Sequence, residues 1–343
     1  MIKIGNREVS RNSKPLIVAE IGINHFGSLK LAKKIVDNIK ECGAEAVKVQ
    51  IHIPNEEMSE EAKKIKPGNS KKNIFKIIQE NSLTLDQELE LKKYIEKKKL
   101  IYIATPFSYA AADWLNKHNI KIFKIGSGEC NNLPLIKYIC KFKKPMIVST
   151  GMNSLNSISK TVSILKKHNI PHVLLHCVNL YPVNYNLIRL NRILMYKKKF
   201  SKSVIGYSDH SIGNAIPIAA LGLGAKLIEK HFVITKKRKG PDVICSMDKE
   251  ELKELLIASR QIYDSLNSNK DIINQENITR RFAFHSVVSN THILKGQKLN
   301  RKNLTTKRPG TGDFPASKIY TLYGKISKKN IRKNRLIKKN DIR

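Results

Sequence analysis

Two histidines that close short apolar runs are the first residues whose positions suggest chemistry. His210 ends the segment Ser208-Asp209-His210, and His231 lies in Ile228-Glu229-Lys230-His231-Phe232. If these runs are adjacent parallel strands, both imidazoles reach one divalent cation. Mn2+, Mg2+ or Zn2+ would suit two nitrogens plus water and substrate oxygens. Asp242 follows the second run and could join this cluster. The alternative is a pair of unrelated polar histidines at the end of a sheet.

Two lysines are expected to point into the same region. Lys48 lies in Ala46-Val47-Lys48-Val49-Gln50, and the two-residue period of a strand puts Lys48 and Gln50 on the face opposite the valines. Lys124 precedes Gly126-Ser127-Gly128, whose backbone N–H groups could form an anion nest around the serine. A buried ammonium group needs an anion or loses its charge. The lysines therefore predict a phosphate or carboxylate ligand, or alternatively a Schiff base with a carbonyl substrate.

Carboxylates and hydroxyls also follow the apolar runs. Glu20 and Glu129 each occur at the end of such a run. A carboxylate there is costly to bury unless it has a partner or a role, although a structural ion pair would explain it as well. His176 is expected to be a satisfied core histidine and not a ligand. The other polar residues at these ends are Thr105, Ser127, Ser149, Asn179, Tyr181 and Ser208.

The elements that must position these residues are eight short β-branched runs, separated by helical stretches such as Leu29–Glu41 and Leu155–His168. Eight strand–helix units predict an α/β fold, a TIM (β/α)8 barrel, which usually needs ~250 residues. Catalytic groups of such a barrel lie at the carboxyl ends of its strands, where the polar residues above occur. The segment Ile2–Val9, with a Gly5-Asn6 turn, predicts a hairpin that could plug the other end. The runs span 16–21, 46–51, 100–104, 121–125, 145–149, 172–176, 203–206 and 225–232.

The predicted domains follow from where this alternation stops. The hairpin and barrel are expected to occupy residues 1–266, as the catalytic domain. The polar stretch 267–281 predicts a linker. Residues 282–343 contain short strands, turns and few helix signals, so we expect a separate small β-rich domain there.

Cysteine content and the apolar segments indicate the cellular compartment of the protein. The five cysteines form no C-x-x-C pair, which favours reduced thiols in a cytosol. Met1–Asn12 lacks the apolar core of a signal peptide. The longest apolar stretch, Ile216–Ile228, is interrupted and too short to span a bilayer. We therefore expect a cytoplasmic protein with no membrane partner.

The net charge of +36 raises the alternative of a nucleic-acid-binding protein. The lysines are spread along the whole chain, and no aromatic-interleaved basic motif or zinc-finger spacing occurs. We therefore expect no nucleic-acid partner, and a basic surface that concentrates anionic substrates. A nucleic-acid-binding protein would instead show tight, steeply salt-dependent binding.

The chain resembles the bacterial N-acetylneuraminate (sialic acid) synthase family over essentially its whole length. The last domain resembles the antifreeze-like (SAF) domain of that family. The resemblance implies that phosphoenolpyruvate, N-acetylmannosamine and water give N-acetylneuraminate and phosphate. The segments that carry the resemblance are Ala19–His25, Lys124–Glu129, Ser149–Met152, Ser208–His210, Glu229–Phe232, Gly240–Asp242 and Lys307–Gly310.

The resemblance also implies a role for each matching residue. His210 and His231 would bind the metal, with Mn2+ expected first and Mg2+ or Co2+ as alternatives. Glu20 and Glu129 would stabilise positive charge and move protons. Arg308 would reach the neighbouring subunit's site in a domain-swapped homodimer and contact the N-acetyl group. Phosphoenolpyruvate would be held by Lys48, Thr105, Lys124, Ser127, Ser149, Asn179 and Ser208, and the open-chain sugar by Gln50, Asn69, Tyr181 and Asp242.

Two enzymatic alternatives remain open from the sequence. A legionaminic or pseudaminic acid synthase would keep the fold and use a di-acetamido sugar. A Schiff-base aldolase would use Lys124 or Lys48 with pyruvate. Phe26 stands where the family commonly has a polar residue, which leaves the sugar contacts near it open.

Overall fold

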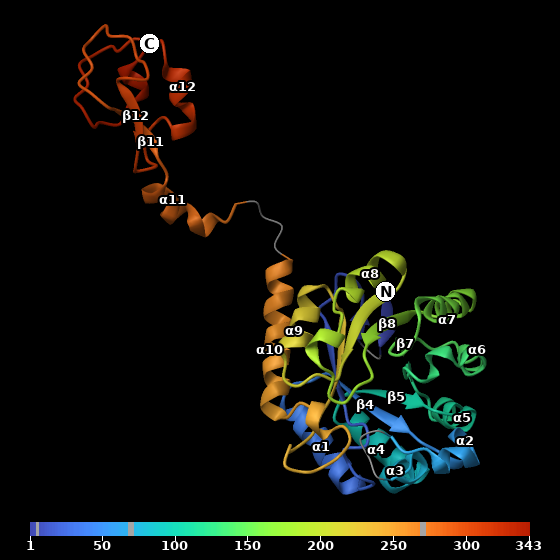
Figure 1. Cartoon of the computed structure of the whole chain (residues 1–343). Coiled ribbons are helices and arrows are strands. Elements are labelled where there is room, and N and C mark those ends of the chain that lie inside the picture. Colours follow the sequence, from blue (N-terminus) through green and yellow to red (C-terminus); the bar gives the residue numbers. More distant parts are fainter. Residues whose placement is uncertain (5–6, 68–71, 268–271) are drawn as a thin grey trace. The chain divides into compact units, whose positions relative to one another are not determined.

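The computed structural model describes residues 1–4, 7–67, 72–267 and 272–343. It divides the chain into two units, Met1–Asn267 and Ser268–Arg343. Figure 1 colours the chain from one terminus to the other.

Eight parallel strands of the first unit form a closed barrel, which confirms the predicted TIM-type fold. The ring is closed where β10 pairs with β3. Glu20 and Lys48 are partners in one ladder, and Lys230 and Asp209 in another. In ring order after β10 (Leu227–His231), the strands are β3 (Leu16–Glu20), β4 (Ala46–Ile51), β5 (Ile101–Pro106), β6 (Phe123–Ile125), β7 (Met146–Ser149), β8 (His172–Cys177) and β9 (Val204–Asp209).

Helices surround the barrel because alternate strand residues face outward and are apolar. Val47 and Val49 pack into the same core as Ile35 of α1. Capping boxes at Thr84 and Asp248 begin α4 and α10. The helices are α1 (Leu29–Glu41), α2 (Pro54–Glu57), α3 (Ile74–Asn81), α4 (Leu85–Lys97), α5 (Tyr109–Lys117), α6 (Leu133–Cys140), α7 (Leu155–Lys167), α8 (Arg192–Lys199), α9 (Ala215–Gly222) and α10 (Lys249–Leu266).

An N-terminal hairpin, β1 (Ile2–Ile4) and β2 (Arg7–Val9), closes the amino-terminal end of the barrel. Ile2, Ile4 and Val9 are buried in one cluster with residues from inside the barrel, such as Leu16 and Leu227. The Gly5-Asn6 turn lies outside the described residues.

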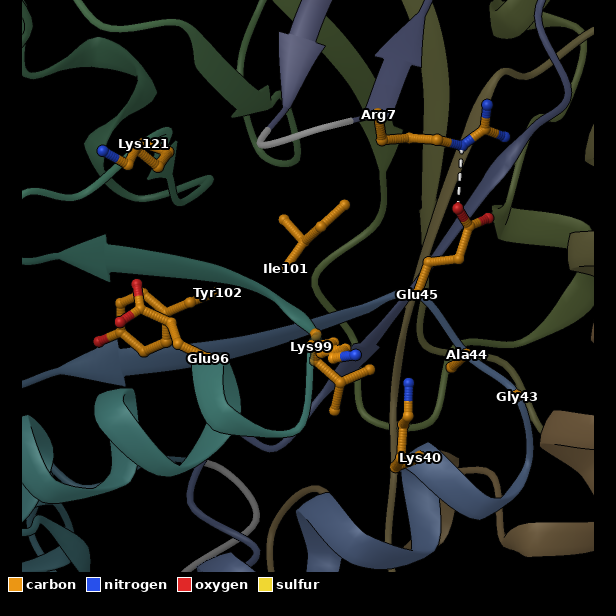
Figure 2. Close-up of a pocket in the computed structure, with 11 residues that line it drawn as sticks. Arg7, Lys40, Gly43, Ala44, Glu45, Glu96, Lys99, Ile101, Tyr102 and Lys121 are labelled. Carbon is orange, nitrogen blue, oxygen red and sulfur yellow. Dashed lines mark ion pairs between the residues drawn. The ribbon is translucent and has the colours of Figure 1, made fainter.

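An ion pair holds this hairpin to the strands. Arg7 Nε lies 3.1 Å from Glu45 Oε2, just before β4, as Figure 2 shows. A cavity of about 640 Å³ opens beside it, with Lys40, Lys99 and Tyr102 among its lining residues. It adjoins the amino ends of β4 and β5, whereas the predicted catalytic residues lie at the carboxyl ends.

The second unit has its own small core. Val287, Leu304 and Ile337 are buried there together with five other apolar residues. Its elements are α11 (Asn277–Ala283), β11 (Ser286–Ser289), β12 (Leu304–Lys307) and α12 (Ile319–Leu322). Helix α11 begins within the stretch 267–281 that the sequence predicts as a linker. Its apolar residues Ile278 and Phe282 are 76% and 59% exposed, so no buried face signals this helix.

All five cysteines are free thiols. Among the described residues, no helix combines the length and apolar character needed to cross a membrane.

Candidate active site

The carboxyl ends of β3, β4 and β5 bring four predicted residues together. The ammonium nitrogen of Lys48 lies 2.9 Å from Glu20 Oε2 and 3.5 Å from the hydroxyl oxygen of Thr105. Gln50, two residues further along the same face of β4, donates to Glu20 Oε1 at 3.0 Å. The structure therefore places one cation, one carboxylate, one amide and one hydroxyl in the mouth of the barrel.

Glu229 links Lys48 with the second predicted lysine. Its Oε1 is 3.6 Å from the ammonium nitrogens of both Lys48 and Lys124. The same oxygen accepts a hydrogen bond from the hydroxyl of Ser208 at 3.2 Å. Its other oxygen, Oε2, is buried and has no hydrogen-bond partner among the described residues. Two lysines thus share a carboxylate that an incoming phosphate or carboxylate group could replace.

Burial and charge act in opposite directions on these groups. Burial raises the pKa of Glu20 to about 7, although Lys48 lowers it. Burial also raises the pKa of Glu229, but the ammonium groups of Lys124 and Lys48 outweigh it and leave the pKa lowered. Burial lowers the pKa of Lys124, whereas the carboxylates of Glu20 and Glu229 outweigh burial at Lys48 and raise its pKa. Glu20 therefore changes charge near neutral pH, as a general acid–base group must, while Glu229 stays ionised.

Hydroxyl and amide groups line the other side of the mouth. Lys124 donates to the hydroxyl of Ser149 at 2.7 Å, and the N–H of Gly151 donates to the hydroxyl of Ser127 at 3.1 Å. Glycine at residue 151 leaves room for this packing, because a Cβ there would displace the amide oxygen of Asn179 and crowd the Ser127 hydroxyl. This close packing directs an ammonium group and several neutral hydrogen-bonding groups at one place, as an anionic oxygen requires.

The two predicted metal ligands also meet. The rings of His210 and His231 have centroids 5.6 Å apart. His210 Nδ1 donates to the carbonyl of Val178 at 2.8 Å, so its lone pair is on Nε2. His231 Nδ1 lies 3.8 Å from Asp242 Oδ2 and is buried without a hydrogen-bond partner in the described part of the chain. Burial lowers the pKa to about 4 for His210 and about 3 for His231, so both imidazoles are neutral at pH 7.

This arrangement fits a divalent cation. Two neutral imidazoles lie next to each other, and a buried nitrogen of His231 has no hydrogen-bond partner among the described residues. Gly22 keeps the space beside His231 open, because it has φ +52° and a Cβ there would lie 3.0 Å from the His231 ring. No group of three or more histidine, cysteine, aspartate or glutamate side chains among the described residues is arranged to hold a metal. Water and substrate oxygens would therefore complete the coordination.

A cavity of about 280 Å³ opens next to His231. Three predicted sugar contacts, Gln50, Tyr181 and Asp242, line it together. The Tyr181 ring also packs on His210, with centroids 4.1 Å apart. The rest of the lining is apolar and consists of Ile23, Pro67, Ile74, Ile77, Ile78 and Pro241.

The remaining predicted residues are Glu129, Arg308 and Asn69. Glu129 is partly buried near Gly126, and burial raises its pKa. Within the described residues, no hydrogen bond or ion pair joins its side chain to the lysines. Arg308 belongs to the second unit, where its Nε donates to the carbonyl of Ala283 at 3.1 Å. Asn69 lies outside the described residues.

Sequence reasoning missed two members of the site although a signal for each was present. Glu229 lies two residues before His231, so the period of a strand puts both side chains in the mouth. His52 follows Gln50 at the same spacing, and its Nε2 lies 3.1 Å from Gln50 Oε1.

Comparisons with known proteins cover both units of the chain. A model of the NeuB family matches residues 35–271, and a model of the SAF domain matches residues 285–343. The chain is 37% identical over 335 residues to the N,N'-diacetyllegionaminic acid synthase of Campylobacter jejuni, covering 95% of this chain and 99% of that protein. It is 34% identical over 314 residues to the human N-acetylneuraminate-9-phosphate synthase, covering 90% of this chain and 87% of that protein.

A solved structure shows the same architecture. The crystal structure of the N-acetylneuraminic acid synthetase from Leptospira borgpetersenii, in complex with citrate, matches with a TM-score of 0.74 and 32% identity. The match covers 82% of this chain and 95% of that chain. It agrees with a parallel barrel followed by a SAF domain.

Proposed function

The chain belongs to the NeuB family of sialic-acid-type synthases, and from that premise we propose that it condenses phosphoenolpyruvate with an open-chain N-acetylated amino sugar. The observation that carries the proposal is the carboxylate of Glu229 between two buried ammonium groups, next to two neutral histidines. Phosphoenolpyruvate and a divalent cation would then bind next to each other at the mouth of the barrel.

Lys48 and Lys124 would bind the phosphate and carboxylate of phosphoenolpyruvate. These lysines contact the carboxylates of Glu20 and Glu229, so both ammonium groups are held at the mouth of the barrel. Thr105 and Ser149 already hydrogen-bond to the same ammonium groups, so they are placed to add neutral contacts to the anion. Charge-assisted hydrogen bonds of this kind bind phosphate strongly.

A divalent cation held by His210 and His231, Mn2+ in the first instance, would polarise the aldehyde oxygen of the sugar. C3 of phosphoenolpyruvate attacks the aldehyde carbon, and positive charge develops at C2. The ionised carboxylate of Glu20, beside Lys48, is placed to stabilise that charge and to accept a proton from the attacking water. Glu129 is the second candidate for this proton. Loss of phosphate from the tetrahedral intermediate then gives the nonulosonic acid.

N-acetylmannosamine is the acceptor that we propose first. Gln50, Tyr181 and Asp242 offer it hydrogen bonds, and their cavity reaches His231, where the aldehyde must lie. Asn69 would contribute a further contact. The second unit would supply Arg308 to the N-acetyl group of the neighbouring subunit in a domain-swapped homodimer.

A di-acetamido deoxy sugar is the second candidate, because the cavity has an apolar wall. Ile74 and Ile78 of α3 are only partly buried and line it together with Ile77. Methyl groups of a second acetamido substituent or of a deoxy carbon would bury apolar area against this wall.

A second cavity beyond Tyr181 is lined by the cations Lys236, Arg238 and Lys239, and two of these three already have partners, which gives a phosphorylated acceptor less support. Lys236 is paired with Glu251 at 2.5 Å, and the guanidinium of Arg238 stacks 4.0 Å from the centre of the Phe26 ring.

Phosphate release from phosphoenolpyruvate tests the proposal. The purified protein would be given N-acetylmannosamine, its 6-phosphate or a 2,4-diacetamido-2,4,6-trideoxyhexose, each with Mn2+ or with a chelator. We expect sugar-dependent release that the chelator abolishes. Phosphate release that does not depend on the sugar would contradict the proposal. Borohydride trapping of pyruvate on the protein in the presence of the chelator would favour a Schiff-base aldolase.

A further inference from the structure

Strand β4 directs three consecutive inward side chains at the mouth. Lys48 and Gln50 are followed at the same two-residue spacing by His52, just beyond the last strand residue Ile51. The side chain of His52 is 6% exposed, so its two ring nitrogens need partners from the protein.

Three neighbours fix the His52 ring. Its Nδ1 lies 3.0 Å and 3.1 Å from the two carboxylate oxygens of Glu57, in the short helix α2. Its Nε2 lies 3.1 Å from Gln50 Oε1. Phe107 stacks on the ring with centroids 4.3 Å apart and an angle of 11° between the planes. The ring can therefore neither rotate nor tilt without losing a contact.

The direction of the Gln50 amide follows from these contacts. Gln50 Nε2 donates to Glu20 Oε1 at 3.0 Å, so its carbonyl oxygen faces His52. A carbonyl oxygen only accepts, and therefore His52 Nε2 must donate. The Glu57 carboxylate likewise accepts from Nδ1, so this pattern of hydrogen bonds belongs to the doubly protonated imidazolium, which forms an ion pair with Glu57. If the amide turned over, its oxygen would face Glu20 and repel the ionised carboxylate, which is the form that the proposed mechanism uses.

We propose that His52, oriented by Glu57, is a positioning residue that locks the Gln50 amide so that its NH2 group faces Glu20 and the acceptor cavity. The inference rests on the proposed function, since Gln50 lines that cavity and Glu20 lies beside the donor site. Among the described residues, the hydrogen bonds of His52 reach the site by way of Gln50, and its loss leaves Lys48, Lys124 and the histidines of the cation site with their own hydrogen bonds and ion pairs.

Two substitutions separate this role from simple packing. His52→Phe keeps the stack on Phe107 and removes the donor, whereas His52→Gln keeps an N–H donor. We expect His52→Phe to raise KM for the amino sugar roughly tenfold, the effect of one lost hydrogen bond to a fixed group, with KM for phosphoenolpyruvate changed less than about twofold. His52→Gln should keep KM for the sugar within about threefold of wild type.

His172→Phe is the matched control. His172 is a buried histidine at the amino end of β8, with both ring nitrogens in hydrogen bonds to Ile170 and Ser203. It should change thermal stability without the selective rise in sugar KM. Equal KM changes for both substrates in His52→Phe, or the same pattern in His172→Phe, would overturn the proposal. If His52→Phe does not fold, Glu57→Gln provides a milder test with the same expected selectivity.

A measurement on the protein without substrates tests the inference independently of catalysis. In NMR spectra of the glutamine side-chain amides, Gln50 should give two slowly exchanging N–H signals in wild type and His52→Gln. In His52→Phe these hydrogens should exchange faster with solvent, and their chemical shifts should change. A Gln50 amide that is unchanged in His52→Phe would contradict the lock, whether or not the protein releases phosphate from phosphoenolpyruvate.

Discussion

Glu229 and Lys124 face each other across the barrel, with Glu229 Oε1 3.6 Å from the ammonium nitrogen. Their strands, β10 and β6, are not neighbours in the ring, because β3, β4 and β5 lie between them on one side. Since Lys48 contacts the same oxygen, the carboxylate spans the centre of the mouth. The resting protein thus holds a negative charge where the proposed donor anion binds.

Glu229→Gln tests whether this carboxylate takes part in the reaction. The amide keeps the shape and the hydrogen bond with Ser208, but it removes the negative charge between the two lysines, which we expect to assist Glu20 in stabilising the positive centre at C2. We expect kcat to fall about 100-fold, comparable to the loss of one electrostatic contact in a transition state. KM for phosphoenolpyruvate should stay equal or decrease, because two lysines lose a competing anion. An unchanged kcat in steady-state assays would show that Glu229 only separates the lysines.

Glu20 should set one limb of the pH profile. Burial raises its pKa to about 7, so it is protonated below that pH and ionised above it. The proposed mechanism uses the ionised form, and kcat/KM is therefore expected to rise with pH through about 7 and then level off. Glu20→Gln should lower kcat/KM about 100-fold and remove this limb. A variant that keeps the same rising limb would assign the titration to another group.

Local patterns were enough to predict the strands and much of the mouth. The run 46–51 coincides with β4, and the two-residue period of a strand is enough to put Lys48 and Gln50 on the inward face. The same two-residue period puts Glu229 on the face of His231 and His52 on the face of Gln50, so both inward positions were predictable from the sequence.

The remaining relationships depend on closure of the ring, which no local pattern contains. Only the pairing of β10 with β3 brings Glu229 to the space between Lys48 and Lys124. Helix α11 was also missed, because it has only one pair of large apolar residues at helical spacing, Ile278 and Phe282, and is too short to give a repeated apolar pattern. Thus side-chain direction could be predicted, whereas contacts across the barrel could not.

A buried ion pair behind the two histidines is expected to control cation binding. Lys230 and Asp209 precede His231 and His210, contact each other with fully buried side chains, and are joined further through Ser211. Replacing the pair by Lys230→Met with Asp209→Asn should weaken Mn2+ binding roughly tenfold, as loss of support behind metal ligands does. Isothermal titration of the protein without substrates would measure this.

Lys92→Met serves as the control for that double variant. Lys92 is another buried lysine, paired with Glu96 at 2.7 Å on α4, away from the cation site. Its loss should affect thermal stability and leave Mn2+ affinity unchanged. If the double variant binds Mn2+ as tightly as the Lys92→Met protein, the ion pair has no role in placing the histidines.

Arg308 can be tested by complementation between subunits. Arg308→Ala should fold normally and raise KM for the amino sugar at least tenfold, because one charged hydrogen bond is lost. Lys124→Met should fail to bind phosphoenolpyruvate and should therefore be inactive. A mixed dimer of the two variants would contain one intact barrel paired with one intact Arg308, so mixing after dissociation should restore part of the activity. Absence of any recovery in dimers shown to have exchanged would place Arg308 outside the neighbouring site.

Carbon–carbon bond formation is the most direct test of the central claim. Phosphoenolpyruvate labelled with carbon-13 at C3 would be incubated with the protein, Mn2+ and the best acceptor, and followed by NMR. The account predicts that the vinyl signal is replaced by a ring methylene signal whose hydrogens couple to the hydrogen on the former aldehyde carbon, with one phosphate released for each product. Conversion of the label to the methyl group of pyruvate, or an unchanged vinyl signal with every acceptor, would contradict it.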